Sequence, residues 1–203
     1  RPITTLTGVA EFCEVFYTDV RIPITNIIGE VDQGWSVATS LLGLERGEEA
    51  ATNPIWFRAE LDRIIALAQE RGLSDDPVVR DKLAWCYSKV EIMRYLGYRI
   101  ITQYVKDGAL GPEASISKLY WSEYHKEAVE LAIHLLGADA LVREGRRPLR
   151  FFRTDEPGAP NNSSSWIDIF LLNSRSGTLY AGTSQIQRNI LGETMLGLPR
   201  EPR

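Results

Sequence analysis

Residues 76–108 read DPVVRDKLAWCYSKVEIMRYLGYRIITQYVKDG and predict one long amphipathic helix. Their apolar residues recur at alternating steps of three and four, which is the spacing of one face of an α-helix. Asp76 and Pro77 supply a cap and a first-turn residue at its start, and Gly108 ends it. The apolar stripe must be covered by other helices. It consists of Val79, Leu83, Cys86, Val90, Met93, Gly97, Ile100 and Tyr104.

Further helices are predicted on both sides of this segment. A helical period runs over residues 33–72, where Pro54 either kinks the helix or starts a fresh one capped by Asn53. Residues 112–137 predict another long helix, and residues 166–180 predict a shorter one. Three long helices and a shorter one favour a mainly α protein built as an antiparallel up-down four-helix bundle.

The first 32 residues differ from the rest. They are rich in Thr, Val, Ile and Phe, a composition typical of strands and turns. Segments near 3–7 and 11–21, with Gly8 between them, predict a short β-hairpin at the N-terminus. Such a hairpin is marginally stable alone, so we expect it to pack against other structure. We therefore divide the chain into residues 1–32 and a helical domain over residues 33–203.

Composition excludes several classes of function. The net charge of −4 shows no basic footprint of a nucleic-acid-binding protein, and the basic run over 143–150 is short enough to be a solvated loop. Cys13 and Cys86 form no metal or redox motif, and we expect two buried thiols in a reducing compartment. No apolar run reaches the roughly 20 residues of a membrane span. We expect a cytoplasmic protein that contacts neither nucleic acid nor membrane.

Residues 180–190 read YAGTSQIQRNI and predict a tight turn at Gly182 between two helices. Ser184 and Gln187 have the spacing of a capping box at the start of the second helix. The free N–H groups and the positive dipole end of that helix make a candidate anion or phosphate site. The alternative is a helix–turn–helix corner without a ligand.

Glu45 is the first candidate for chemistry. It lies on a predicted helix beside the apolar residues 41–44. A carboxylate against apolar surface has a raised pKa, which suits a general base that removes a proton from carbon. Arg46 could instead keep it ionised, or Glu45 could be a surface residue in an acidic cluster with Glu48 and Glu49.

Four segments, in this order, resemble the acyl-CoA dehydrogenase family. They are EFCEVFYTDVRIP (11–23), GEVDQGW (29–35), LERG (44–47) and GTSQIQRNI (182–190). The resemblance implies that residues 1–32 end the family's middle β-domain and that residues 33–203 are its C-terminal helical domain. It implies the α,β-dehydrogenation of an acyl-CoA thioester in fatty acid β-oxidation, with FAD as the cofactor. Only the back half of a family member is matched, so this stretch alone is expected to be inactive and to bind FAD weakly.

The resemblance also assigns a base. The family carries its catalytic glutamate either just before the Gly-Thr of the C-terminal turn or on the first helix of the C-terminal domain, just before an arginine. This chain has Ala181 at the first position and Glu45 at the second. Glu45 is therefore the predicted base, and Arg46 beside it is predicted to bind substrate.

Cofactor contacts carry over in the same way. Thr183 and Gln185 match residues that lie near the FAD. His134, Gly137 and Ala138 match a stretch that meets the FAD diphosphate across a subunit interface, although the family has Gln at the first position and Gly at the third. From the residues alone, His134 would be a core histidine at an apolar helix end.

The partners implied by the resemblance are the acyl-CoA substrate, an electron-transfer flavoprotein and other subunits. We expect a homodimer or homotetramer, with a hetero-oligomer containing a paralogue as the alternative. Six large residues off the main stripe predict an exposed interface. The competing hypothesis is a non-catalytic oligomerisation module or a structural subunit of a mixed oligomer. The six residues are Trp85, Tyr95, Tyr98, Ile101, Trp121 and Tyr124.

Overall fold

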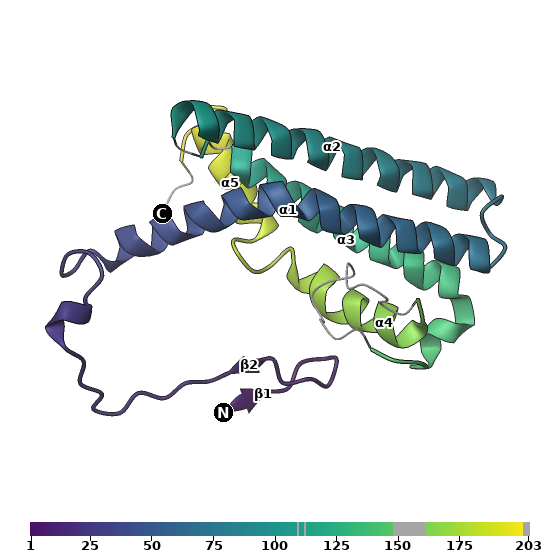
Figure 1. Ribbon diagram of the computed structural model, residues 1–203, viewed down its shortest axis with the longest axis horizontal. Helices are drawn as coiled ribbons and strands as arrows, with labels where there is room; N and C mark the ends of the chain where they lie inside the picture. Colours follow the sequence, from purple (N-terminus) through teal and green to yellow (C-terminus); the bar gives the residue numbers. More distant parts are fainter. Residues whose placement is uncertain (109, 112, 148–160, 201–203) are drawn as a thin grey trace.

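The computed structural model shows a bundle of long helices with an extended N-terminal arm (Figure 1). Three long helices form its centre: α1 (Gly34–Glu70), α2 (Pro77–Asp107) and α3 (Glu113–Leu136). The structure describes residues 1–108, 110–111, 113–147 and 161–200, apart from the side chains of residues 43–48 and 173.

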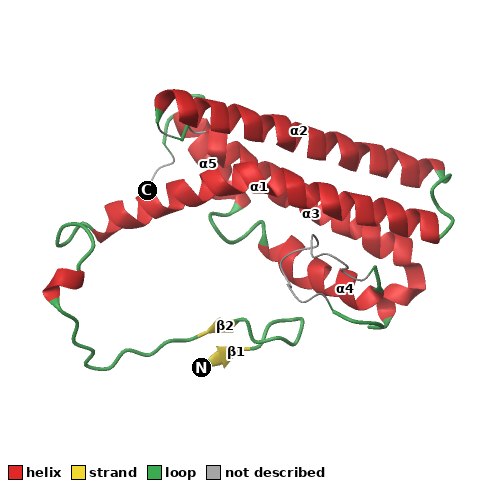
Figure 2. Cartoon of the chain, in the orientation of Figure 1, coloured by secondary structure: helices red, strands yellow, loops and turns green. Residues whose placement is uncertain are grey.

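Shorter elements complete the bundle. The 3-10 helix η2 (Gly137–Leu141) follows α3, and α4 (Ser163–Asp168) continues directly into the π-helix η3 (Ile169–Ser174). This composite helix packs along α3, and α5 (Ser184–Thr194) packs near the other end of α3 (Figure 2). The predicted mainly α bundle with an N-terminal hairpin is confirmed. None of the described helices is both long and apolar enough to cross a membrane.

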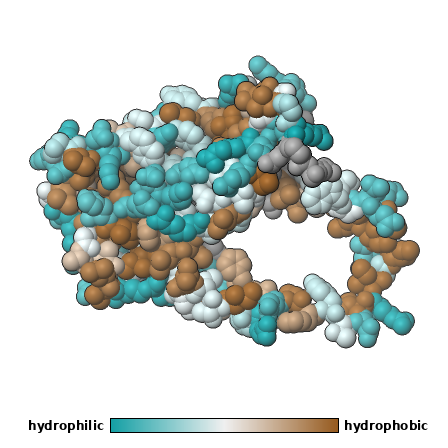
Figure 3. Space-filling model, turned by 180° about the vertical axis from the view of Figure 1, so that it is seen from behind, coloured by the Kyte–Doolittle hydropathy of each residue, from teal (hydrophilic) through white to brown (hydrophobic). Residues whose placement is uncertain are grey.

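The N-terminal arm holds little regular structure. Strand β1 (Pro2–Ile3) pairs antiparallel with β2 (Phe12–Cys13), a shorter hairpin than the sequence predicts. A single 3-10 turn, η1 (Ile24–Asn26), interrupts the extended chain that leads to α1. The arm leaves many hydrophobic side chains exposed (Figure 3). Cys13 is exposed as well, so the expectation of two buried thiols holds only for Cys86.

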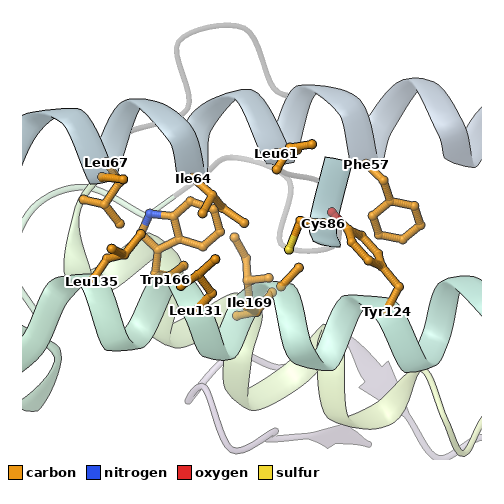
Figure 4. Packing of buried hydrophobic residues seen from close by; sticks show 14 of the residues in the cluster. Phe57, Leu61, Ile64, Leu67, Cys86, Tyr124, Leu131, Leu135, Trp166 and Ile169 are labelled. Carbon is orange, nitrogen blue, oxygen red and sulfur yellow. The ribbon is translucent and has the colours of Figure 1, made fainter. Parts of the chain in front are cut away.

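The core lies between α1, α2, α3 and the composite helix. Trp166 and Ile169 insert between the rows of apolar side chains on α1 and α3 (Figure 4). The predicted stripe of α2 faces this core, except that Leu83 is only partly buried and Tyr104 is exposed. Trp121 and Tyr124 are 5% and 1% exposed. These two residues therefore belong to the core, and their predicted place on an exposed interface is wrong.

Helix α1 passes through Pro54 without ending, so the alternative of a fresh helix capped by Asn53 is wrong. Proline has no N–H to donate to the carbonyl four residues earlier, which here belongs to Ala50. That carbonyl faces α2. A Cβ built on Gly97 would lie 2.4 Å from the oxygen of Ala50 and 3.7 Å from Cγ of Pro54. The close approach of α1 and α2 therefore requires glycine at position 97.

An ionic cluster joins the arm to the bundle. Asp168 is 1% exposed, and its carboxylate lies 2.5 Å from Nη1 of Arg143 and 3.0 Å from Nε of Arg147. Arg147 also donates through Nη2 to the carbonyl oxygen of Thr7 at 2.9 Å. Thr7 is itself buried. The expected solvated loop over residues 143–150 thus supplies two arginines that bind a buried carboxylate.

We predict that Gly97→Ala destabilises the protein. At an open helix position alanine would stabilise by about 1 kcal/mol over glycine. Here the new methyl group meets a backbone oxygen, so we expect the free energy of unfolding to fall by about 1–3 kcal/mol. Gly192→Ala is the control, since its Cβ would lie 3.5 Å from Leu198, an ordinary contact. Urea unfolding measures both variants, and equal stabilities would contradict the close approach.

We also predict that Asp168→Asn weakens the fold. The substitution removes the carboxylate shared by Arg143 and Arg147 and should lower the free energy of unfolding by about 2–4 kcal/mol. Asp139→Asn is the matched control because Asp139 pairs with Arg71 at the surface. An exposed pair is worth about 0–1 kcal/mol. Thermal unfolding would overturn the assignment if both variants lost the same small amount.

Candidate functional site

The turn before α5 forms through two left-handed residues in succession. Ala181 has φ +51° and Gly182 has φ +89°. The residue that caps α5 is Thr183, whose Oγ1 accepts a hydrogen bond from the amide of Ile186 at 3.2 Å. The turn predicted at Gly182 is therefore present, but its cap is Thr183 and not Ser184.

The two side chains of the predicted capping box make other hydrogen bonds. Ser184 donates through Oγ to the carboxylate of Glu123 on α3 at 2.7 Å. This bond is the main reason that the pKa of Glu123 lies below its ordinary value. Gln187 donates through Nε2 to the carbonyl oxygen of Ala181 at 3.0 Å. These side chains therefore bind α3 and the turn, and they do not cap the amide groups of α5.

A buried lysine of α3 holds the other side of the turn. Lys118 is 1% exposed, and its Nζ donates to the carbonyl oxygens of Gly177 at 2.8 Å and Gly182 at 2.7 Å. The same ammonium group lies 5.9 Å from the ring centroid of Tyr180. Helix α3 therefore binds the segment before α5 at two points, the carbonyls of Gly177 and Gly182.

Trp121 of α3 contacts both helix α1 and the residue Tyr180 before the turn. The indole Nε1 of Trp121 donates to Glu49 of α1 at 3.4 Å, and its ring centroid lies 6.2 Å from that of Tyr180. Partial burial raises the pKa of the Tyr180 hydroxyl to about 12, and the negative charge of Glu49 adds to that rise. Glu49 and Tyr180, 131 positions apart in the sequence, are thus electrostatic neighbours.

The predicted base lies next to this contact along the chain. Glu45 and Arg46 belong to the backbone of α1, while their side chains fall outside the part that the structure describes. Residue 45 precedes Glu49 by one helical turn, about 6 Å along the axis, on the same side of the helix. Position 45 therefore lies one helical turn from the residue whose charge acts on Tyr180, and Ala181, the family's other position for a base, directly follows Tyr180.

The residues predicted to contact the flavin lie at the start of α5. Thr183 is half-buried and Gln185 is exposed. Both flank the N-terminal end of an 11-residue helix, where amide groups and the positive dipole end favour an anionic or hydrogen-bond-accepting ligand. An exposed amide and a hydroxyl at such an end fit the polar edge of a flavin. The assignment of both residues to FAD remains a prediction.

The residues predicted to contact the diphosphate lie elsewhere. His134, Gly137 and Ala138 are all exposed at the C-terminal end of α3 and the start of η2. His134 is therefore not a core histidine. Gly137 has φ +60°, and a Cβ there would meet no atom within 4 Å, so its backbone is open to a ligand. Lys118 and His134 are 16 positions apart, which is about 24 Å of helix, so the predicted diphosphate residues and the turn are two separate sites on one chain.

The sequence analysis missed a buried polar pair in the core. His125 of α3 and Glu60 of α1 are both buried, and their Nε2 and Oε2 atoms are 3.1 Å apart. Burial, with the charge of Glu60 adding to it, raises the pKa of the nearby Cys86 thiol to about 12, which keeps this thiol protonated at neutral pH. In the described parts of the chain, no group of three or more His, Cys, Asp or Glu side chains could hold a metal ion. Lys118 and His125 lie seven positions apart on the buried face of α3, a spacing that could have revealed them.

Known proteins resemble this chain along its whole length. The family model for the C-terminal domain of acyl-CoA dehydrogenases matches residues 32–196. Acyl-CoA dehydrogenase IpdE1 of Mycolicibacterium smegmatis is 33% identical over 201 residues, which cover 99% of this chain and 46% of that protein. IpdE1 of Mycobacterium tuberculosis is 31% identical over 203 residues, covering 100% and 48%. The chain thus spans about half the length of these relatives.

Solved structures give the same result. The Tcur3481–Tcur3483 steroid ACAD superposes with a TM-score of 0.76 at 26% identity, covering 99% of this chain and 49% of that one. The ChsE4–ChsE5 complex from Mycobacterium tuberculosis superposes with a TM-score of 0.75 at 28% identity, covering 100% and 49%. The match of the family model to most of the residues, together with the helical architecture, shows that this chain belongs to the acyl-CoA dehydrogenase family.

Proposed function

We propose that this chain is the C-terminal half of a flavin-dependent acyl-CoA dehydrogenase that introduces an α,β double bond into an acyl-CoA thioester. The observation that carries this proposal is the meeting of α1 with the turn before α5. Glu49 on α1, Trp121 on α3 and Tyr180 before the turn are in contact or within electrostatic range of one another. The family's two positions for a base are neighbours of these residues along the chain, since Glu45 lies one helical turn before Glu49 and Ala181 directly follows Tyr180, and this supports the proposal.

Glu45 is the proposed base, and it removes the α-proton of the thioester. Ala181 has no group that could accept a proton, so the helix position has to supply one. One turn further along α1, Glu49 accepts a hydrogen bond from Trp121 of α3, whose ring centroid lies 6.2 Å from that of Tyr180. The proposed role needs a carboxylate whose pKa lies near the working pH. Arg46 is proposed to contact the substrate.

When bound, FAD would supply the acceptor for the hydride that leaves the β-carbon. Thr183 and Gln185 are proposed to hold it at the start of α5. His134, Gly137 and Ala138 are proposed to hold the diphosphate of a neighbouring subunit's FAD, which their exposure at the end of α3 supports. An electron-transfer flavoprotein is the proposed electron acceptor. The similar structure described as a steroid ACAD favours a bulky acyl group.

We predict that Glu45→Gln in the intact enzyme keeps the fold and the flavin but loses activity. General-base catalysis contributes about 10²–10⁴-fold to a rate, so turnover should fall by that factor. The assay follows reduction of an electron-accepting dye by acyl-CoA, and the flavin absorbance reports cofactor content. Glu48→Gln is the control from the same acidic cluster. Full activity in the Glu45 variant would remove this residue from the role of base.

A second function is favoured by the surface of α2. Tyr95 and Tyr98 are 62% and 57% exposed, and Trp85 and Ile101 are exposed as well. A groove of about 340 Å³ between α1 and α2 is lined in part by Pro54, Gly97, Tyr98 and Ile101. Exposed apolar surface of this kind usually marks an interface. We propose that this face joins subunits, either copies of this chain or a paralogue, and that the chain could serve such an assembly as a structural subunit.

We predict a discrete dimer or tetramer in sedimentation equilibrium, since closed symmetry is the commonest form of assembly. Replacing both Tyr95 and Tyr98 by Ser should shift the protein towards the monomer because it removes aromatic area from the interface. Tyr17→Ser is the control, as Tyr17 is also exposed, at 79%, but lies on the N-terminal arm. A monomer at tens of micromolar, or open-ended aggregation, would contradict the interface.

A further inference from the structure

The strongest feature outside the proposed chemistry is the environment of Lys118. Its charge is removed from water, which costs free energy unless hydrogen bonds replace the lost hydration. Nζ finds two such acceptors in the carbonyls of Gly177 and Gly182, and Tyr180 presents its ring to the same ammonium group. The two carbonyl oxygens, five residues apart in the sequence, accept hydrogen bonds from the same Nζ atom. Lys118 therefore closes residues 177–182 into a loop.

This loop contains strained backbone. The backbone of Ala181 is in the left-handed region, which residues other than glycine seldom adopt, and Gly182 follows it with another positive φ. Such a conformation persists only where its surroundings hold it. On the α5 side, Gln187 bonds the carbonyl of Ala181. On the α3 side, Lys118 bonds the carbonyl of Gly182, which directly precedes Thr183.

The same face of α3 also holds α1. Trp121 lies three positions after Lys118, so the two side chains are neighbours on the helix surface. Trp121 contacts Glu49 of α1 and lies against Tyr180 of the loop. One turn of α3 thus fixes both the loop and the segment of α1 that carries position 45.

We propose that Lys118 is a positioning residue, whose two hydrogen bonds set the place of the turn and of Thr183 and Gln185 relative to position 45 on α1. It does not act on substrate itself, since it is buried and its ammonium group donates to backbone carbonyls. The two hydrogen bonds from Lys118 to the carbonyls of Gly177 and Gly182, here called the clasp, are inferred from these contacts alone. The meaning of the clasp for catalysis rests on the proposed function.

The test uses Lys118→Met in the intact holoenzyme, because methionine keeps the apolar stem and removes the ammonium group. Lys82→Met is the control, a substitution of the same chemistry at an exposed position on α2. Hydrogen exchange of peptides over residues 177–184 reports the turn directly. Losing two charge-assisted hydrogen bonds should speed exchange there by about 10- to 100-fold, while exchange in α2 stays unchanged. FAD affinity and turnover should fall in the same variant with little change in KM.

The outcomes separate the two proposals. Faster exchange in the turn with weaker FAD binding supports the positioning role. Faster exchange in a protein whose wild type neither binds FAD nor oxidises acyl-CoA supports the clasp and overturns the proposed function. Exchange in the turn equal to that of Lys82→Met overturns the clasp. If Lys118→Met does not fold, the wild type decides, because a turn that exchanges as fast as the exposed residues 15–22 of the N-terminal arm is not held by α3.

Discussion

Helix α3 is enclosed by the rest of the chain, and this constraint shapes everything around it. It contacts α1, α2, α4, η3 and α5, so its polar side chains must find partners within the protein. Lys118 binds the turn before α5, Glu123 binds the first residue of α5, and His125 pairs with Glu60 of α1. Each of these contacts satisfies a buried group and also fixes a neighbouring element in place.

The candidate site is therefore assembled by helix packing. Its parts come from the first third and the last sixth of the chain, which are far apart in the sequence. The close approach of α1 and α2 at Ala50 and Gly97 sets where α1 lies, just after the segment that carries Glu45. Trp121 then joins α1 to the turn. A small shift of α1 would move the predicted base and the turn apart, although both lie far from the packing contact.

Local patterns predicted the local features of this fold. The spacing of apolar residues gave the length and inward face of α2, and Gly182 marked the turn. The sequence could not show which partner a polar residue finds, because the partner lies on a distant element. Ser184 therefore looked like a cap although it bonds Glu123, and the arginines at 143 and 147 looked solvated although they bind Asp168. The apolar end of α3 predicts a buried His134, whereas His125, on the enclosed side of α3, is the core histidine.

The two groups of predicted cofactor residues lie near opposite ends of α3. Thr183 and Gln185 flank the end gripped by Lys118, and His134, Gly137 and Ala138 lie at the other end, about 24 Å away along a rigid helix. A single helix cannot bend to bring both groups onto one side of a small cofactor. If both assignments hold, each chain contributes to two different flavin sites, and the second site is completed only by another subunit. Cofactor binding and assembly would then depend on each other, because subunits that separate would each lose half of the contacts.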